Sequence, residues 1–204
     1  MSLIIATFVA MPTAQAAPPT AELTVHGEMV VPSCTVAAAD DGVYDLGKIS
    51  ATLIKPNADT QLTPMSKHWT ISCDADTYLT LTPTDHRADS STNSASGYYG
   101  LGNINGSGKI GTYYVEMANG TVDGTPTSLF TTSSSAIAPK ATTYIHKGYV
   151  SGWAAGTNRL QNGRVFGANL IIYPTLASSS MMQGSITEDS NIDGAMTLNF
   201  AFGI

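Results

Sequence analysis

The residues of this chain with most capacity for chemistry are its four histidines, its two cysteines and one short charged cluster. No histidine stands at metal-ligand spacing from another histidine or from a cysteine. The cluster Asp85-His86-Arg87 could bind an ion or a sugar, and a solvated loop is the simpler interpretation. No nucleophile-elbow motif occurs, and nothing selects a pair of acids for glycoside hydrolysis. The sequence therefore predicts neither a catalytic centre nor a cofactor.

A glycine-rich segment and a tryptophan are two further candidates for ligand binding, and each also has a purely structural interpretation. The glycine-rich residues 100–108 lack the spacing of a nucleotide-binding motif, and no helical pattern follows them, so we expect a flexible loop. Trp153 is flanked by Gly152 and Gly156. An exposed loop tryptophan could stack on a sugar ring, whereas core packing is the alternative. With Asp85 and His86, Trp153 makes up the candidate ligand loop of this chain.

The N-terminus and the cysteines together indicate export. Residues 3–11 are apolar apart from Thr7 and Ala14-Gln15-Ala16 follows, which is typical of a secretory signal and its cleavage site. An apolar first strand is the alternative. Cys34 and Cys73 are the only cysteines. In an exported protein an even pair indicates one disulfide, worth about 4 kcal/mol in the chain-entropy model, with a free buried pair as the alternative.

Composition limits the partners of the chain. The 204 residues suffice for one sizeable domain. Charged residues are only 12% of the total and the net charge is −6, with nine Lys plus Arg residues that form no cluster. Because phosphate binding requires clustered basic side chains, nucleic acids and anionic membrane surfaces are excluded as expected partners.

Strand patterns run along the whole chain, and the two clearest lie near its ends. Glu22–Val31 and Ile192–Ile204 alternate apolar and other residues with a period of two, which is typical of strands with one buried face. Between them, short apolar runs are separated by turn residues such as Asn119-Gly120, and no capped helix is visible. We predict an all-β sandwich. A terminal strand this apolar needs a partner on its open edge.

The order of several short motifs resembles that of a known family. Residues 27–36 are similar to the Gly-Glu-x-Val-x-x-x-Cys opening of chaperone–usher pilins, and Cys73 follows at a pilin-like distance. More specifically, nearly the whole mature chain resembles the β-fimbria subunit family of bacterial proteins. The matching segments are Leu23-Thr24-Val25-His26-Gly27, Pro32-Ser33-Cys34, residues 44–50, Thr70-Ile71-Ser72-Cys73-Asp74, Asp85-His86-Arg87, Gly100-Leu101-Gly102, Lys109-Ile110-Gly111 and Tyr173-Pro174-Thr175-Leu176.

The resemblance implies an immunoglobulin-like, pilin-type sandwich that lacks its last strand and is completed by a donor strand. A periplasmic chaperone fills the open groove, and an outer-membrane usher exchanges it for the N-terminal extension of the next subunit, giving a head-to-tail polymer. The implied donor residues here are Leu23, Val25, Gly27 and Met29. The implied acceptor-groove and chaperone-binding residues are Met196, Leu198, Phe200 and Phe202. Pilins usually carry a penultimate aromatic residue, and here Gly203 takes that place.

We therefore expect a signal peptide at residues 1–16, an N-terminal extension and first strand at 17–31, and one pilin-like domain at 32–204. The expected function is a structural subunit of a surface fimbria, without catalysis, that passes through the periplasm to the cell surface. A tip adhesin or secreted carbohydrate-binding module, with a host glycan or protein receptor, is the alternative. A secreted enzyme is the third hypothesis.

Overall fold

The computed structural model describes residues 19–29 and 31–202. The chain divides into two units, residues 1–31 and 32–204, and each is described by itself. The predicted signal peptide, residues 1–16, lies outside the described residues. Within the described ranges, no helix has both the length and the apolar character that crossing a membrane requires.

The first unit contains an extension without regular structure. Residues 19–29 form neither helix nor strand, and the side chains of Leu23, Val25 and Met29 are exposed. Among the described residues, no strand is therefore present at 22–29, where the sequence predicts one. The reason is physical, because an extended segment becomes a strand only when another strand forms a hydrogen-bonded ladder with it.

The second unit is an all-β, immunoglobulin-like sandwich, which confirms the predicted fold class. Its described strands are β1 (Cys34–Ala38), β2 (Thr60–Gln61), β3 (Met65–Asp85), β4 (Tyr99–Gly100), β5 (Asn103–Ile104), β6 (Gly108–Lys109), β7 (Gly111–Val122), β8 (Thr125–Pro126), β9 (Ser128–Thr132), β10 (Thr143–Tyr144), β11 (Val150–Gly156), β12 (Arg159–Leu160), β13 (Asn162–Leu176) and β14 (Met196–Phe202). Short 3-10 helices at Ala39–Gly42 (η1), Ala51–Leu53 (η2) and Ala88–Ser90 (η3) complete the described elements.

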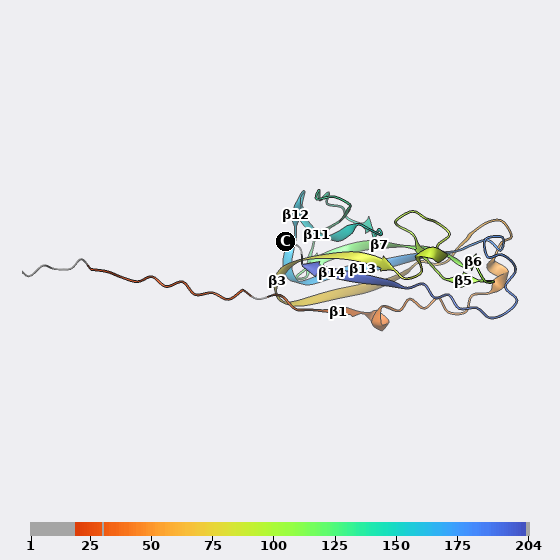
Figure 1. Ribbon diagram of the computed structural model, residues 1–204, viewed down its shortest axis with the longest axis horizontal. Helices are drawn as coiled ribbons and strands as arrows, with labels where there is room; N and C mark the ends of the chain where they lie inside the picture. The colour runs from red at the N-terminus through yellow and green to blue at the C-terminus, as the bar shows by residue number, and fades with distance from the viewer. Residues whose placement is uncertain (1–18, 30, 203–204) are drawn as a thin grey trace, which may run out of the picture. The chain divides into compact units, whose positions relative to one another are not determined.

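The long strand β3 organises the sandwich, because its two halves pair with different strands. Its first half pairs with β1 on one edge and with β13 on the other, and β13 in turn pairs with β7. Its second half pairs with β14 and β11, and β11 pairs with β9. All of these pairs are antiparallel. One strand thus belongs to both layers, and Figure 1 shows β3, β13 and β14 running lengthwise through the unit.

One predicted turn lies elsewhere. Asn119-Gly120 was expected to end a strand, but β7 continues to Val122. Asn119 has a φ of 52°, next to the register shift between β7 and β13 at Gly167/Asn169, so it marks a β-bulge. The chain turns instead at Asp123-Gly124, where φ is 50° and 76°, values that suit a tight hairpin into β8.

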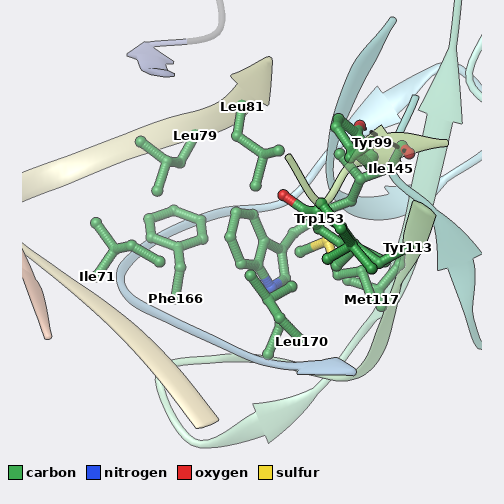
Figure 2. Close-up of a cluster of buried hydrophobic side chains, with 14 of the residues drawn as sticks. Ile71, Leu79, Leu81, Tyr99, Tyr113, Met117, Ile145, Trp153, Phe166 and Leu170 are labelled. Atoms are coloured by element: carbon green, nitrogen blue, oxygen red, sulfur yellow. Dashed lines mark hydrogen bonds between the residues drawn. The ribbon is translucent and has the colours of Figure 1, made fainter. Parts of the chain in front are cut away.

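The core lies between the two layers and is made by alternate residues of the long strands. On β3, Ile71, Leu79 and Leu81 are buried while their neighbours Ser72, Tyr78 and Thr82 are less so. Figure 2 shows the cluster that these residues form with side chains from β4, β7, β11 and β13. Its largest wholly buried members are Trp153, Tyr99 and Phe166.

The two cysteines form a disulfide, as predicted. Cys34 of β1 and Cys73 of β3 are direct partners in the antiparallel ladder and are 39 residues apart in sequence. The alternative of a free buried pair is excluded. The bond fixes β1 to the edge of β3, so the first strand of the domain has a covalent anchor as well as a hydrogen-bonded one.

Candidate functional site

The best candidate site is the neighbourhood of two edge strands, β1 and β14. Within residues 31–202, each of them pairs only with β3, β1 at residues 69–73 and β14 at residues 79–85. The other edge of each strand therefore presents backbone N–H and C=O groups without a ladder partner among the described residues. Such an edge is a template for an additional strand.

The inward face of β14 is only half covered. Met196, Leu198 and Phe200 are half-buried, and Phe202 is 38% exposed, while Thr197, Asn199 and Ala201 between them face solvent. The period-two pattern of the sequence is thus confirmed, although the strand begins at Met196 and not at Ile192. On β1, the apolar Val36 is 46% exposed. Both edge strands keep apolar surface in water, which is unfavourable at about 25 cal/mol per Å².

Beside β14 an apolar pocket reaches the core, and we call it the β14 groove. All of its lining residues are apolar or aromatic, and they come from five strands. The lining consists of Trp69, Ile71, Leu81, Met117, Trp153, Ala168, Leu170, Leu198 and Phe200. The two β14 members, Leu198 and Phe200, stand opposite Pro83 and Leu81 of β3 in the ladder. The groove is narrow, with a volume of about 10 Å³, and it lies next to a strand edge that has no ladder partner among the described residues.

Trp69 is fixed at the groove by a hydrogen-bonded relay. Its indole Nε1–H donates to the hydroxyl oxygen of Tyr44 at 3.1 Å, and that hydroxyl donates to the carbonyl oxygen of Leu170 at 2.9 Å. Burial raises the pKa of Tyr44. The relay satisfies the polar atoms at this wall, so the surface that Trp69 presents to the groove is apolar.

The structure places the predicted acceptor residues in strand β14 and the predicted donor residues in the extension. Of the acceptor residues, Leu198 and Phe200 line the groove, while Met196 and Phe202 lie on the same face of β14 beyond it. The predicted donor residues Leu23, Val25, Gly27 and Met29 belong to the first unit, where they are exposed. The sequence analysis did not assign Val36, Trp69, Ile71 and Leu81 to the neighbourhood of β1 and β14. The alternation of residue types along residues 69–73 does indicate that Trp69 and Ile71 share one face of a strand.

Trp153, Asp85 and His86, the residues of the candidate ligand loop, do not form a common binding site in this structure. Trp153 lies in strand β11 and is 1% exposed, and its Nε1–H donates to the carbonyl oxygen of Gly167 at 2.9 Å inside the core. Figure 2 shows it beside Phe166. The centroids of the two rings are 5.2 Å apart. The interpretation of Trp153 as an exposed sugar-stacking residue is therefore wrong, and core packing is confirmed.

Asp85 and His86 have structural partners. The Asp85 carboxylate is 1% exposed, lies 3.5 Å from Lys147 Nζ and accepts hydrogen bonds from the backbone N–H groups of Arg87 and Gly100. The Nε2 atom of His86 is 2.7 Å from Thr197 Oγ1, close to the start of β14. The pair thus holds the connection between β3, β4 and β14.

The negative charge of Asp85 also affects two buried phenols. Burial is the main cause that raises the pKa values of Tyr99 and Tyr113, and the carboxylate of Asp85 raises both further.

No group of three His, Cys, Asp or Glu residues that could hold a metal ion occurs in the described part of the chain.

Comparison with known protein families gives a match. A family described as "Protein of unknown function (DUF1120)" matches residues 23–129, just over half of the chain. The match begins in the extension and continues through β1, β3 and β7 into β9. No curated protein matches the chain.

Proposed function

We propose that this chain, which belongs to the family described as "Protein of unknown function (DUF1120)", is a structural subunit that polymerises by taking up a strand from a neighbouring copy. The observation that carries the proposal is the β14 groove, an apolar passage into the core beside a strand edge without a partner among the described residues. A strand added there would form ladder hydrogen bonds with its backbone and place alternate side chains against the groove, which would have to widen beyond its volume of about 10 Å³ to admit them.

The extension has the chemistry of such a strand. Leu23, Val25 and Met29 are apolar, lie at odd positions and are exposed, whereas Thr24, His26 and Glu28 between them are polar. A strand presents alternate residues to one face, so the odd positions together form one apolar face. Burying each Leu or Val side chain contributes about 1.5–3 kcal/mol.

The resemblance to chaperone–usher pilins supplies the wider setting of the proposal. In that setting the chain is exported, a periplasmic chaperone occupies the groove, and an outer-membrane usher exchanges the chaperone for the extension of the next subunit. A joint between two different surfaces of the same protein propagates head to tail, so the product is a fibre on the cell surface. The role includes no catalytic step and no nucleic acid.

The test is a thermal melt of residues 32–204 with and without a synthetic peptide of residues 17–31. A ligand at a hundred times its Kd stabilises by about 2.7 kcal/mol, which raises the Tm of a domain of this size by roughly 5–10 °C. A Val25→Asp peptide should lose this effect, because the charge falls on the apolar face. The matched control is Thr24→Asp, which alters the polar face and should still stabilise. Equal behaviour of the two variant peptides, or no stabilisation by the natural one, would refute the proposal.

A further inference from the structure

A second hollow, unlike the β14 groove in its chemistry, lies at the β5–β6 end of the sandwich. It has a volume of about 560 Å³, within the usual range of small-molecule sites. It is bounded by the β5–β6 hairpin and by the segment that leads into β14. Its lining consists of Arg87, Ser90, Gly102, Asn103, Ile104, Asn105, Gly106, Ser190, Asn191 and Asp193. In Figure 1, β5 and β6 lie at the end of the unit opposite to β11 and β12.

The hollow contains two charged residues, and they neutralise each other. Both Nε and Nη2 of Arg87 donate to Oδ2 of Asp193, at 3.0 and 2.7 Å. The guanidinium and the carboxylate are each about half exposed. The remaining polar side chains of the lining are neutral amides and hydroxyls. The hollow therefore has no net charge with which to attract a phosphate or a carboxylate.

The amides at the rim have hydrogen-bonding capacity to spare. Asn103 and Asn191 are exposed, and their side chains make no hydrogen bond to any described residue. The Nδ2 of Asn105 donates to the carbonyl oxygen of Met182 at 2.9 Å. The Oδ1 of Asn105 accepts no hydrogen bond from the described residues. Each free amide offers donors and an acceptor side by side, a combination that suits vicinal hydroxyl groups.

The frame that carries these amides is well fixed. Ser90 Oγ donates to the carbonyl oxygen of Arg87 at 2.7 Å and accepts the N–H of Gly102 at 2.9 Å. Gly102 has a φ of +101°, a backbone conformation that favours glycine, and a Cβ there would also displace the carboxylate of Asp193. The buried Ile104 adds the one apolar side chain of the lining, which can contact the C–H groups of a ligand ring.

We propose that this hollow binds a neutral saccharide, a ligand with many hydroxyl groups, some C–H surface and no charge. Asn103 and Asn191 are assigned the direct hydrogen bonds to the sugar hydroxyls, and the Arg87–Asp193 pair completes the polar wall. The site goes beyond polymerisation, because strand uptake at the β14 groove requires no small ligand. Its test is independent of whether the chain forms a fibre.

The experiment is an NMR titration of the ¹⁵N-labelled chain, residues 17–204, with galactose, glucose, mannose and N-acetylglucosamine, and with N-acetylneuraminic acid as an anionic probe. At least one neutral sugar should shift the amide signals of the hollow in a saturable manner. The double variant Asn103→Ala/Asn191→Ala should weaken this binding at least tenfold. Asn57→Ala, an exposed amide outside the hollow, should leave it unchanged.

Three results would overturn the proposal: no neutral sugar shifts these signals, the shifts persist in the double variant, or only N-acetylneuraminic acid binds. Because Asn103 and Asn191 are exposed and make no side-chain hydrogen bond to the described residues, the double variant should keep the fold. Unchanged signals of the core amides provide the check.

Discussion

We expect the side chain of Leu198 to contribute free energy both to the folding of the domain and to the binding of an added strand. Complete burial of a leucine contributes about 1.5–3 kcal/mol, and Leu198 is only half-buried in the second unit. We expect Leu198→Ala to lower the free energy of unfolding of residues 32–204 by about 1 kcal/mol. The other half of the effect should appear only when a strand covers the side chain. The Kd of the peptide of residues 17–31 should therefore rise about five- to tenfold, since 1.4 kcal/mol corresponds to a factor of ten.

The matched control is Leu129→Ala. Leu129 is wholly buried in β9 and does not line the β14 groove. Removing its side chain should cost about 2–5 kcal/mol of stability and leave the peptide Kd unchanged under conditions where the variant is folded. Urea unfolding measures the first quantity and isothermal calorimetry the second. If Leu198→Ala destabilised the domain as much as Leu129→Ala and left the Kd unaltered, Leu198 would be an ordinary core residue and the reasoning would fail.

Two further predictions concern the disulfide and one tyrosine. Replacing Cys34 and Cys73 by serine should lower stability in urea by about 4 kcal/mol, because the bond closes a loop with a sequence separation of 39 residues; a loss below about 1 kcal/mol would contradict the loop-entropy argument. The Tyr173 hydroxyl donates to Glu116 at 2.7 Å, which raises its pKa to about 12. The neutral phenol therefore stabilises the fold below pH 10, and this contribution is lost as the pH rises from about 10 to 12. Ultraviolet titration of tyrosinate should give a lower pKa in Glu116→Gln, and an unchanged titration would argue against the hydrogen bond as its cause.

The sequence predicted the elements whose pattern is set by burial on one face. The alternation at residues 196–202 and the pairing of Cys34 with Cys73 follow from local spacing and redox context, and the structure has both. The turn predicted at Asn119-Gly120 is wrong because a left-handed asparagine occurs in a bulge as well as in a hairpin, and only the register of β13 decides between them. Trp153 was ambiguous because its glycine neighbours suggest a loop, whereas they allow close packing within β11.

The candidate sites were less accessible to sequence reasoning, because each is made by segments far apart in the chain. The saccharide hollow joins Asn103 to Asn191 and Arg87 to Asp193, pairs separated by about ninety residues or more. The sequence singles out the segments of Arg87 and Asn103, but no local pattern places the segment of Asn191 and Asp193 against them. Likewise, Trp69 and Leu198 meet at the β14 groove only because β3 pairs with β14 over its second half while its first half supplies the indole. The strand topology brings these residues together at both sites, and local sequence patterns do not reveal that topology.

The spacing of the groove and of the extension gives the polymer proposal its geometric basis. A strand advances about 3.3 Å per residue, so alternate side chains recur roughly every 6.6 Å on one face. Leu198 and Phe200 follow this repeat along β14, and Leu23 and Val25 follow it along the extension. An extension from a second copy, laid along the open edge, would therefore place successive apolar residues beside successive apolar positions of β14. A shift by one residue would turn Thr24 and His26 towards the core instead. Alternation on both sides would thus stabilise one set of registers and disfavour the other, and this would give the proposed joint a defined geometry.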